Sequence, residues 1–144
     1  MPDQPLFPKS VWVLLGLYFV ASLAHFAHNA EFIAFYPNMP HWLTREKVWL
    51  AWLAVSSVGV AAVLLGRFGL PILGTVLLAA YGAFGLDGLG HYALALCTEH
   101  TLATNFTIWS EVVSGLAVLL VSAILVTRRI GRHYARGQSP RPAA

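Results

Sequence analysis

The sequence is poor in charged residues. Lys, Arg, Asp and Glu make up only 10% of its 144 residues, whereas a soluble domain carries about 25%. So few charges cannot cover the surface of a water-soluble globule, and 58% of the residues are hydrophobic. The mean hydropathy of +0.67 agrees with this bias. The composition therefore excludes an ordinary soluble domain and indicates an integral membrane protein.

Cysteine is nearly absent as well, since Cys97 is the only one. One thiol excludes an internal disulfide, a CxxC redox motif and an iron–sulfur cluster. We interpret Cys97 as a small apolar residue near a helix end. No serine or cysteine lies in a recognisable nucleophile motif, which disfavours covalent catalysis.

Long apolar runs are what the sequence does have. Each of four segments is about as long as the ~20 residues that a helix needs to cross the hydrocarbon core, and runs of this length in lipid are helical. We therefore predict an all-α bundle of four transmembrane helices, forming one domain over residues 1–128. The first segment is too long for a typical signal peptide, so we expect it to be retained. The predicted helices cover residues 10–35, 48–66, 70–96 and 102–126.

Positive charge gathers at the C-terminal end of the sequence. We predict that residues 129–144 form a basic, disordered cytoplasmic tail that touches anionic lipid, with no role in binding nucleic acid. The distribution of Lys and Arg predicts that both termini lie in the cytoplasm. Arg45 and Lys47 are exceptions, because this orientation puts them on the outer side. We expect a multi-pass protein of the bacterial inner membrane. The arginines of this end are Arg128, Arg129, Arg132, Arg136 and Arg141.

Ionisable residues gather in the predicted outer half of three of these helices. Within a span such groups cost a few kcal/mol each on insertion scales, so they usually face the bundle interior and pair with one another. Several are three or four residues apart and share a helix face. We therefore predict a polar pocket of histidines and carboxylates in the outer leaflet. Its residues are His25, His28 and Glu31 in the first helix, Asp87 and His91 in the third, and Glu111 in the fourth.

This set of side chains supports two chemical hypotheses. Neutral imidazoles and carboxylates bind Zn, Fe or Mn, and all six residues are candidate metal ligands. Alternatively, a histidine beside a carboxylate is suited to general acid–base chemistry on a lipidic small molecule. The candidate catalytic residues are then His25, His28, Asp87, His91 and Glu111.

Non-catalytic roles stay open at this point. A haem held by His25 or His28 against His91 is a less favoured alternative. The chain also fits an accessory subunit of a larger complex or a small transporter, in which the same charges would hold helices together.

The motif "HNAEF", which contains His28 and Glu31, is followed by the proline-bearing "FYPNMPHWLTRE". This arrangement resembles the signature of the uncharacterised bacterial membrane proteins called the HXXEE family. Phe32 stands where that pattern has its second glutamate. The resemblance implies a small helical bacterial membrane protein of unknown activity.

Overall fold

The computed structural model describes residues 6–137, and side chains through residue 132. Within that range all regular secondary structure is helical, as predicted. The α-helices are α1 (Lys9–Glu31), α2 (Arg45–Arg67), α3 (Pro71–Phe84), α4 (Gly90–Leu94) and α5 (Leu102–Gly137). Three 3₁₀ turns accompany them, η1 (Ile33–Phe35), η2 (Gly85–Leu89) and η3 (Cys97–Glu99).

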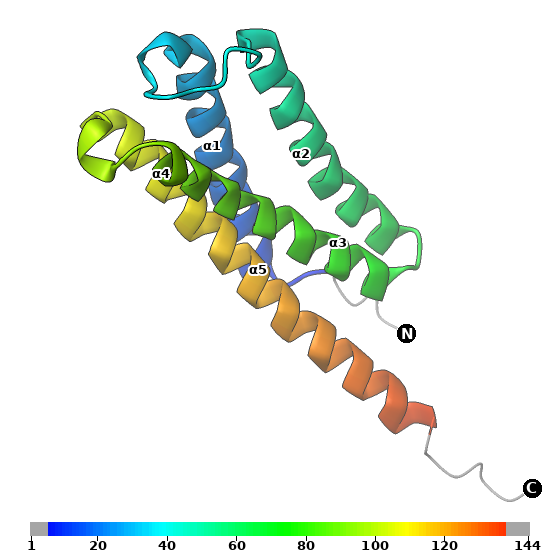
Figure 1. Ribbon diagram of the computed structural model, residues 1–144. Helices are drawn as coiled ribbons and strands as arrows, with labels where there is room; N and C mark the ends of the chain where they lie inside the picture. The colour runs from blue at the N-terminus through cyan, green and yellow to red at the C-terminus, as the bar shows by residue number, and fades with distance from the viewer. Residues whose placement is uncertain (1–5, 138–144) are drawn as a thin grey trace, which may run out of the picture.

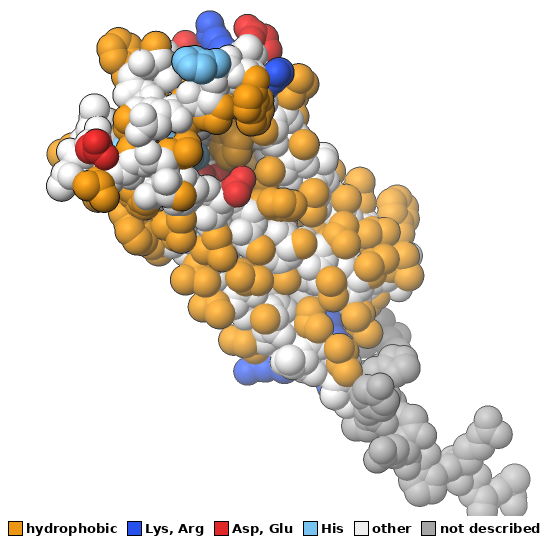
Figure 2. All heavy atoms as spheres, viewed as in Figure 1, with side chains coloured by type: hydrophobic (Ala, Val, Ile, Leu, Met, Phe, Trp, Pro, Cys, Tyr) orange, Lys and Arg blue, Asp and Glu red, His pale blue; other side chains and the backbone are white. Residues whose placement is uncertain are grey.

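Four helical stretches are long and apolar enough to cross a membrane, which confirms the four-helix prediction. Their surface is apolar too, as expected of helices in contact with lipid. Large apolar side chains such as Val20, Leu50 and Val113 are more than 60% exposed in the isolated chain. Hydrophobic side chains cover the length of the bundle, and charged ones lie mostly toward its two ends (Figure 2). The spanning stretches are Lys9–Glu31, Arg45–Arg67, Pro71–Leu94 and Leu102–Arg132.

Several predicted boundaries differ from the structure. Helix α1 ends at Glu31 instead of residue 35, and α2 begins at Arg45 instead of residue 48. The third predicted helix is broken by the turn η2, which follows Phe84. The prediction of disorder is wrong for residues 129–137, because α5 continues to Gly137. Arginine is a good helix former, and the first proline of this end is Pro140. Residues 138–144 of the predicted tail lie outside the described residues.

The bundle is built from three packed helix pairs, α3 with α5, α2 with α3, and α1 with α5. Helices α2 and α3 meet at a tight turn and diverge toward the other end of the molecule (Figure 1). Gly69 makes this turn possible with its φ of 85°, a backbone conformation that side chains disfavour. The divergence leaves the upper halves of α2 and α3 apart, and Figure 2 shows the surface hollowed there, with acidic and histidine side chains inside it.

Helices α3 and α5 are in close contact through glycine. A Cβ atom on Gly82 would lie 2.7 Å from the carbonyl oxygen of Gly115, so only glycine permits this approach. Small residues at helix crossings are typical of membrane bundles. This contact fixes the position of α5 relative to α3, and with it Glu111, which lies one turn before Gly115 in α5.

The two ends of the bundle differ in chemistry. At one end, Arg129 of α5 donates hydrogen bonds to the carbonyl oxygens of Leu6 and Pro71 and to Oγ1 of Thr75. Its guanidinium also lies over the ring of Phe7. Arg129 therefore ties the start of α1, the start of α3 and α5 together. The opposite end carries the connections 32–44 and 95–101, and the polar cluster lies near it.

Candidate functional site

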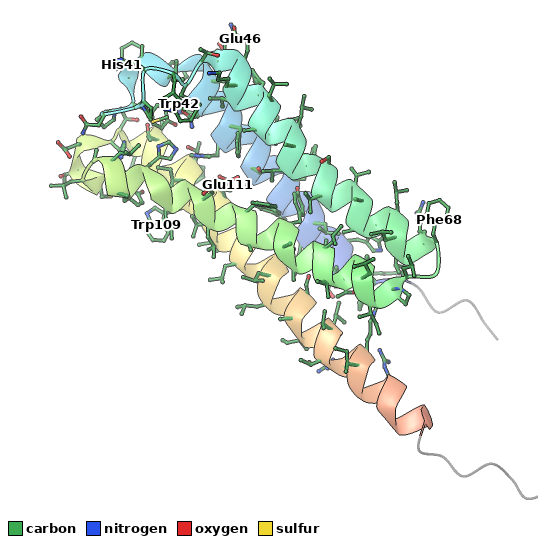
Figure 3. All side chains as sticks on the ribbon, turned by 45° about the vertical axis from the view of Figure 1, so that its right-hand side comes forward. His41, Trp42, Glu46, Phe68, Trp109 and Glu111 are labelled. Carbon is green, nitrogen blue, oxygen red and sulfur yellow. The ribbon has the colours of Figure 1, made fainter. Side chains whose placement is uncertain are left out.

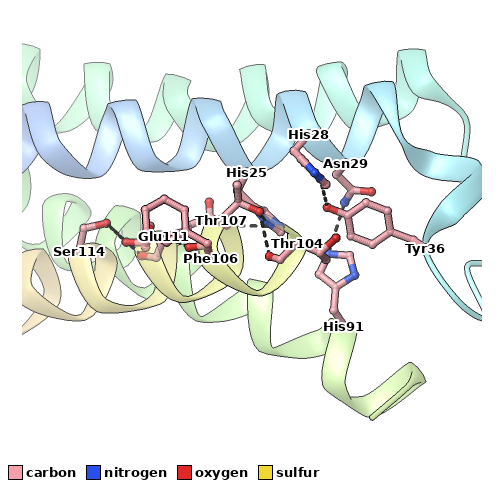
Figure 4. Close-up of polar contacts among 11 residues, drawn as sticks. His25, His28, Asn29, Tyr36, His91, Thr104, Phe106, Thr107, Glu111 and Ser114 are labelled. Atoms are coloured by element: carbon pink, nitrogen blue, oxygen red, sulfur yellow. Dashed lines mark hydrogen bonds and ion pairs between the residues drawn. The ribbon is translucent and has the colours of Figure 1, made fainter. Parts of the chain in front are cut away.

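The centre of the site is a pair of side chains from α1 and α5, His25 and Glu111 (Figure 4). Their exposed fractions are 3% and 1%. Nε2 of His25 lies 3.6 Å from Oε2 of Glu111, and Glu111 lies among the helices, well away from both ends of the molecule (Figure 3). Two ionisable groups buried at this depth are stable only if they compensate one another. The predicted pairing of histidine with carboxylate across helices is therefore present for these two residues.

The surrounding hydrogen bonds fix which nitrogen of His25 carries a proton. The Thr107 hydroxyl donates to the carbonyl oxygen of Thr104 at 2.9 Å, so its single hydrogen is engaged. Nδ1 of His25 lies 3.5 Å from the same hydroxyl oxygen and must be the donor in that long contact. Nε2 then points its lone pair, or a second proton, at Glu111. The two atoms face one another at 3.6 Å, a distance that a small side-chain movement would turn into a hydrogen bond.

The second oxygen of the Glu111 carboxyl has no hydrogen-bond partner. Oε1 is buried without a partner among the described residues, and so is Oγ of Ser22 on α1. Gly88 of η2 approaches the carboxyl from the other side, where an added Cβ would lie 3.5 Å from Oε2. An unpaired buried carboxyl oxygen is costly, and in a native site it usually marks a place for a ligand or a water molecule.

A second layer of side chains continues from His25 toward the end of the bundle. The imidazole of His91, on α4, lies with its ring centroid 5.2 Å from that of His25. Nδ2 of Asn29 lies 3.4 Å from Nε2 of His91, and both residues are buried. Because the amide nitrogen only donates, Nε2 of His91 is the acceptor, and its proton is on Nδ1.

Tyr36 connects this layer to a more exposed histidine. Its ring centroid lies 5.0 Å from that of His91, and its hydroxyl lies 2.8 Å from Nδ1 of His28. Burial raises the pKa of Tyr36 to about 12, so at neutral pH the hydroxyl keeps its proton and can donate to His28 or accept from it, according to the tautomer of His28. Titratable side chains thus extend from the buried Glu111 to the half-buried His28.

Two of the six predicted pocket residues make no hydrogen bond or ion pair with this cluster, Glu31 and Asp87. Glu31 points away and pairs with Arg45 at 2.5 Å, and both side chains are about half exposed. Asp87 is exposed and has no hydrogen bond or ion pair among the described residues. Asp87 lies in the 3₁₀ turn η2, and its carboxylate is still close enough for its charge to act on His91 and Glu111.

Two residues join the site from the connections between helices. Tyr36 is only 5% exposed and contacts both His28 and His91. His100, in the connection 95–101, is 8% exposed, and its ring centroid lies 6.2 Å from that of His91. Neither position has a signal in the sequence, because both are brought inward by the path of a loop.

The geometry gives the metal hypothesis no support. Among residues 6–132, no group of three or more His, Cys, Asp and Glu side chains is arranged to hold a metal ion. The histidine rings instead contact one another edge to face, as His25 and His91 do. Binding of Zn, Fe or Mn stays a prediction from the sequence.

Comparison of the chain with protein-family models, with curated proteins and with solved structures finds no match. The resemblance to the HXXEE proteins therefore stays a prediction, which concerns His28 and Glu31. In the structure these two residues have different surroundings. His28 belongs to the buried cluster through Tyr36, and Glu31 belongs to the exposed pair with Arg45.

Proposed function

We propose that this chain is a membrane-embedded enzyme that performs acid–base chemistry on a lipidic small molecule. The observation that carries the proposal is the buried pair of His25 and Glu111, with one carboxyl oxygen left free. In this mechanism Glu111 and His25 exchange one proton with the substrate. His91, Asn29 and Tyr36 connect the pair to the end of the bundle and hold the histidine rings in place.

The electrostatics of the pair support this chemistry. A neutral imidazole with a protonated carboxyl and an imidazolium with a carboxylate have the same net charge. Moving the shared proton between Nε2 and Oε2 therefore creates no net charge in the low-dielectric interior, where an isolated ion is very costly. A proton can be delivered to a substrate from such a pair, and general acid–base groups typically accelerate a reaction by about 10²–10⁴-fold.

The same proposal includes the orientation of the chain. We place the His25–Glu111 end toward the outer leaflet and both termini in the cytoplasm of a bacterial inner membrane. Arg67, Arg128 and Arg129 lie at the opposite end of the described helices, in agreement with the preference of Lys and Arg for the cytoplasmic side. The substrate is then a lipid that reaches the pair from within the bilayer.

Isotope incorporation tests the proposed activity without knowledge of the substrate. The purified protein is reconstituted with the membrane lipids of the cells that produce it, in D₂O or in H₂¹⁸O. Proton transfer at carbon incorporates deuterium into a lipid, and hydrolysis incorporates ¹⁸O. We expect mass spectrometry to find at least one lipid species labelled by the wild type and unlabelled by Glu111→Gln and His25→Leu.

The matched control for this experiment is Glu31→Gln. Glu31 lies on α1, as His25 does, but its carboxylate pairs with Arg45 outside the cluster. Labelling by this variant should therefore continue at the wild-type rate. Equal labelling by the wild type and Glu111→Gln, or no labelled lipid at all with the folded wild type, contradicts the enzyme proposal. Either result would favour the non-catalytic alternatives, an accessory subunit or a transporter.

A further inference from the structure

Four buried polar atoms near the centre of the bundle have no hydrogen-bond partner among the described residues. A buried donor or acceptor without a partner costs about 1–3 kcal/mol, and lipid offers none in exchange. Helix α1 packs against both α2 and α5, so unpaired atoms on these three helices indicate that something polar lies beside α1. The atoms are Nε1 of Trp52 and Oγ of Ser56 on α2, Oγ of Ser22 on α1, and Oε1 of Glu111 on α5.

One of these residues also lines an apolar groove that faces the membrane. The groove lies between α1 and α2, has a volume of about 400 Å³ and ends on Tyr81 of α3. Ser56 is its only hydroxyl-bearing residue besides Tyr81, and no Lys, Arg, Asp or Glu lines it. From Trp12 to Phe19 it follows α1 for roughly 10 Å at 1.5 Å rise per residue.

The polar end of the groove lies toward the His25–Glu111 pair. Phe19 lines the groove and its ring centroid lies 5.5 Å from that of Trp52. Ser56 follows Trp52 by one helical turn, so the two share a face of α2. On α1, Ser22 lies one turn beyond Phe19, near the Glu111 carboxyl but outside hydrogen-bond geometry, and His25 follows one turn later.

A second groove, between α1 and α5, lacks this arrangement. It is larger, at about 590 Å³, and is lined by Val20, Thr107 and Ser110 among other residues. The Thr107 and Ser110 hydroxyls, however, donate to carbonyl oxygens of their own helix at 2.9 and 2.7 Å. Its polar groups are therefore satisfied, and nothing in it requires a polar ligand.

We propose that the groove between α1 and α2 binds a neutral lipid with a single oxygen-bearing head, a long-chain alcohol, aldehyde or ketone. The chain lies along Gly16, Val60 and Leu64, and the head oxygen accepts from Trp52 Nε1 and contacts Ser56 Oγ. A phosphate head is excluded because no cation lines the groove and Glu111 lies beyond its polar end. The inference rests on the proposed function and names its substrate class.

Photoaffinity labelling tests this site directly. The probe is hexadecanol with a diazirine on its chain, presented to the full-length protein in phosphatidylcholine nanodiscs, and mass spectrometry locates the crosslinks. We expect crosslinks on the α1 and α2 residues of the groove, competed by unlabelled hexadecanol and not by hexadecyl phosphate. Ser56→Ala should weaken the labelling roughly threefold to tenfold, as expected for loss of one hydrogen bond.

Two neighbouring substitutions serve as controls. Ser57→Ala changes an exposed serine whose hydroxyl bonds within α2 and should leave labelling unchanged. Val60→Phe should block the groove, whereas Val20→Phe, an equally exposed valine in the other groove, should not. Crosslinks spread evenly over the lipid-facing helices, equal effects of Ser56→Ala and Ser57→Ala, or equal competition by hexadecyl phosphate would overturn the proposal.

The result is separable from that of the isotope experiment. Site-specific crosslinking without isotope incorporation would support the lipid-binding site and contradict the enzymatic role. Isotope incorporation with crosslinks outside the α1–α2 groove would support the enzymatic role and contradict this substrate site.

Discussion

Nε2 of His25 faces Oε2 of Glu111 across the α1–α5 interface, at 3.6 Å and almost without solvent contact. The two residues are 86 positions apart in the sequence, so only the packing of the first and last helices brings them together. A buried pair of this kind has consequences for stability as well as for chemistry.

The first prediction concerns the energetic coupling of the pair. His25→Leu or Glu111→Leu alone leaves a buried ionisable group without its partner and should lower the free energy of unfolding by about 3–5 kcal/mol. The double substitution should recover part of this loss, because both polar groups are removed together. Denaturant titration in detergent, arranged as a double-mutant cycle, measures the coupling. Additive effects of the two substitutions would show that the residues do not interact.

The second prediction concerns Tyr36. Tyr36→Phe removes the hydroxyl that bonds to His28 and should cost about 1 kcal/mol of stability. It should also slow isotope incorporation severalfold, because the connection between the buried pair and the bundle end is broken. The control is Tyr92→Phe, which loses a hydrogen bond of 2.8 Å to Asn105 at the same end. It should show a similar loss of stability with an unchanged rate, and equal rates in both variants would assign Tyr36 a structural role only.

The third prediction concerns the α3–α5 contact. Gly82→Ala would place its Cβ 2.6 Å from the backbone nitrogen of Leu119 and 2.7 Å from the Gly115 oxygen. Backbone atoms on both sides cannot move easily, so we expect a loss of about 1–3 kcal/mol. Gly16→Ala, on α1, meets nothing within 4 Å and should leave the melting temperature unchanged or slightly raised. Similar melting temperatures for both variants would contradict the close packing.

The fourth prediction concerns Arg129. Arg129→Leu leaves the carbonyl oxygens of Leu6 and Pro71 without a donor and should destabilise the protein by about 2 kcal/mol or more. The neighbouring Arg128 is exposed, so Arg128→Leu serves as the control and should have little effect. Limited proteolysis at the start of α1 should increase only in the Arg129 variant.

The fifth prediction concerns metals. Because the proposed chemistry uses the His25–Glu111 proton, isotope incorporation should persist after treatment with a chelator. Elemental analysis and a visible spectrum of the purified protein accompany this test. Loss of labelling that is restored by zinc, iron or manganese would support the metal hypothesis, and a Soret band lost in His28→Ala or His91→Ala would support haem.

The helices could be predicted because their signal is local. The length of each apolar run gives the approximate length of its helix. The positions of His25, His91 and Glu111 within their runs place them at a similar depth, without knowledge of any contact. The break at Phe84 carries a weaker signal, because Gly85, Gly88 and Gly90 are also frequent in continuous membrane helices. Asp87 lies within this break, in the turn η2.

The loops explain the other differences between the predicted and observed sites. Glu31 lies at the end of α1, where Arg45 reaches it across the connection 32–44. Tyr36 and His100 turn inward from their loops and bury themselves against His91. Such contacts depend on the path of the loop in space, which helical periodicity does not describe.

Nitrogen NMR of His25 tests the central claim most directly, namely that His25 and Glu111 share one proton inside the bundle. In ¹⁵N-histidine-labelled protein, with His25→Gln used to assign the signals, we predict a protonated Nδ1. The Nε2 resonance should shift in Glu111→Gln and stay unchanged in Glu31→Gln. A His25 ring without a proton on Nδ1 would contradict the assigned tautomer, and an Nε2 resonance that does not respond to Glu111→Gln would contradict the shared proton and the chemistry proposed for it.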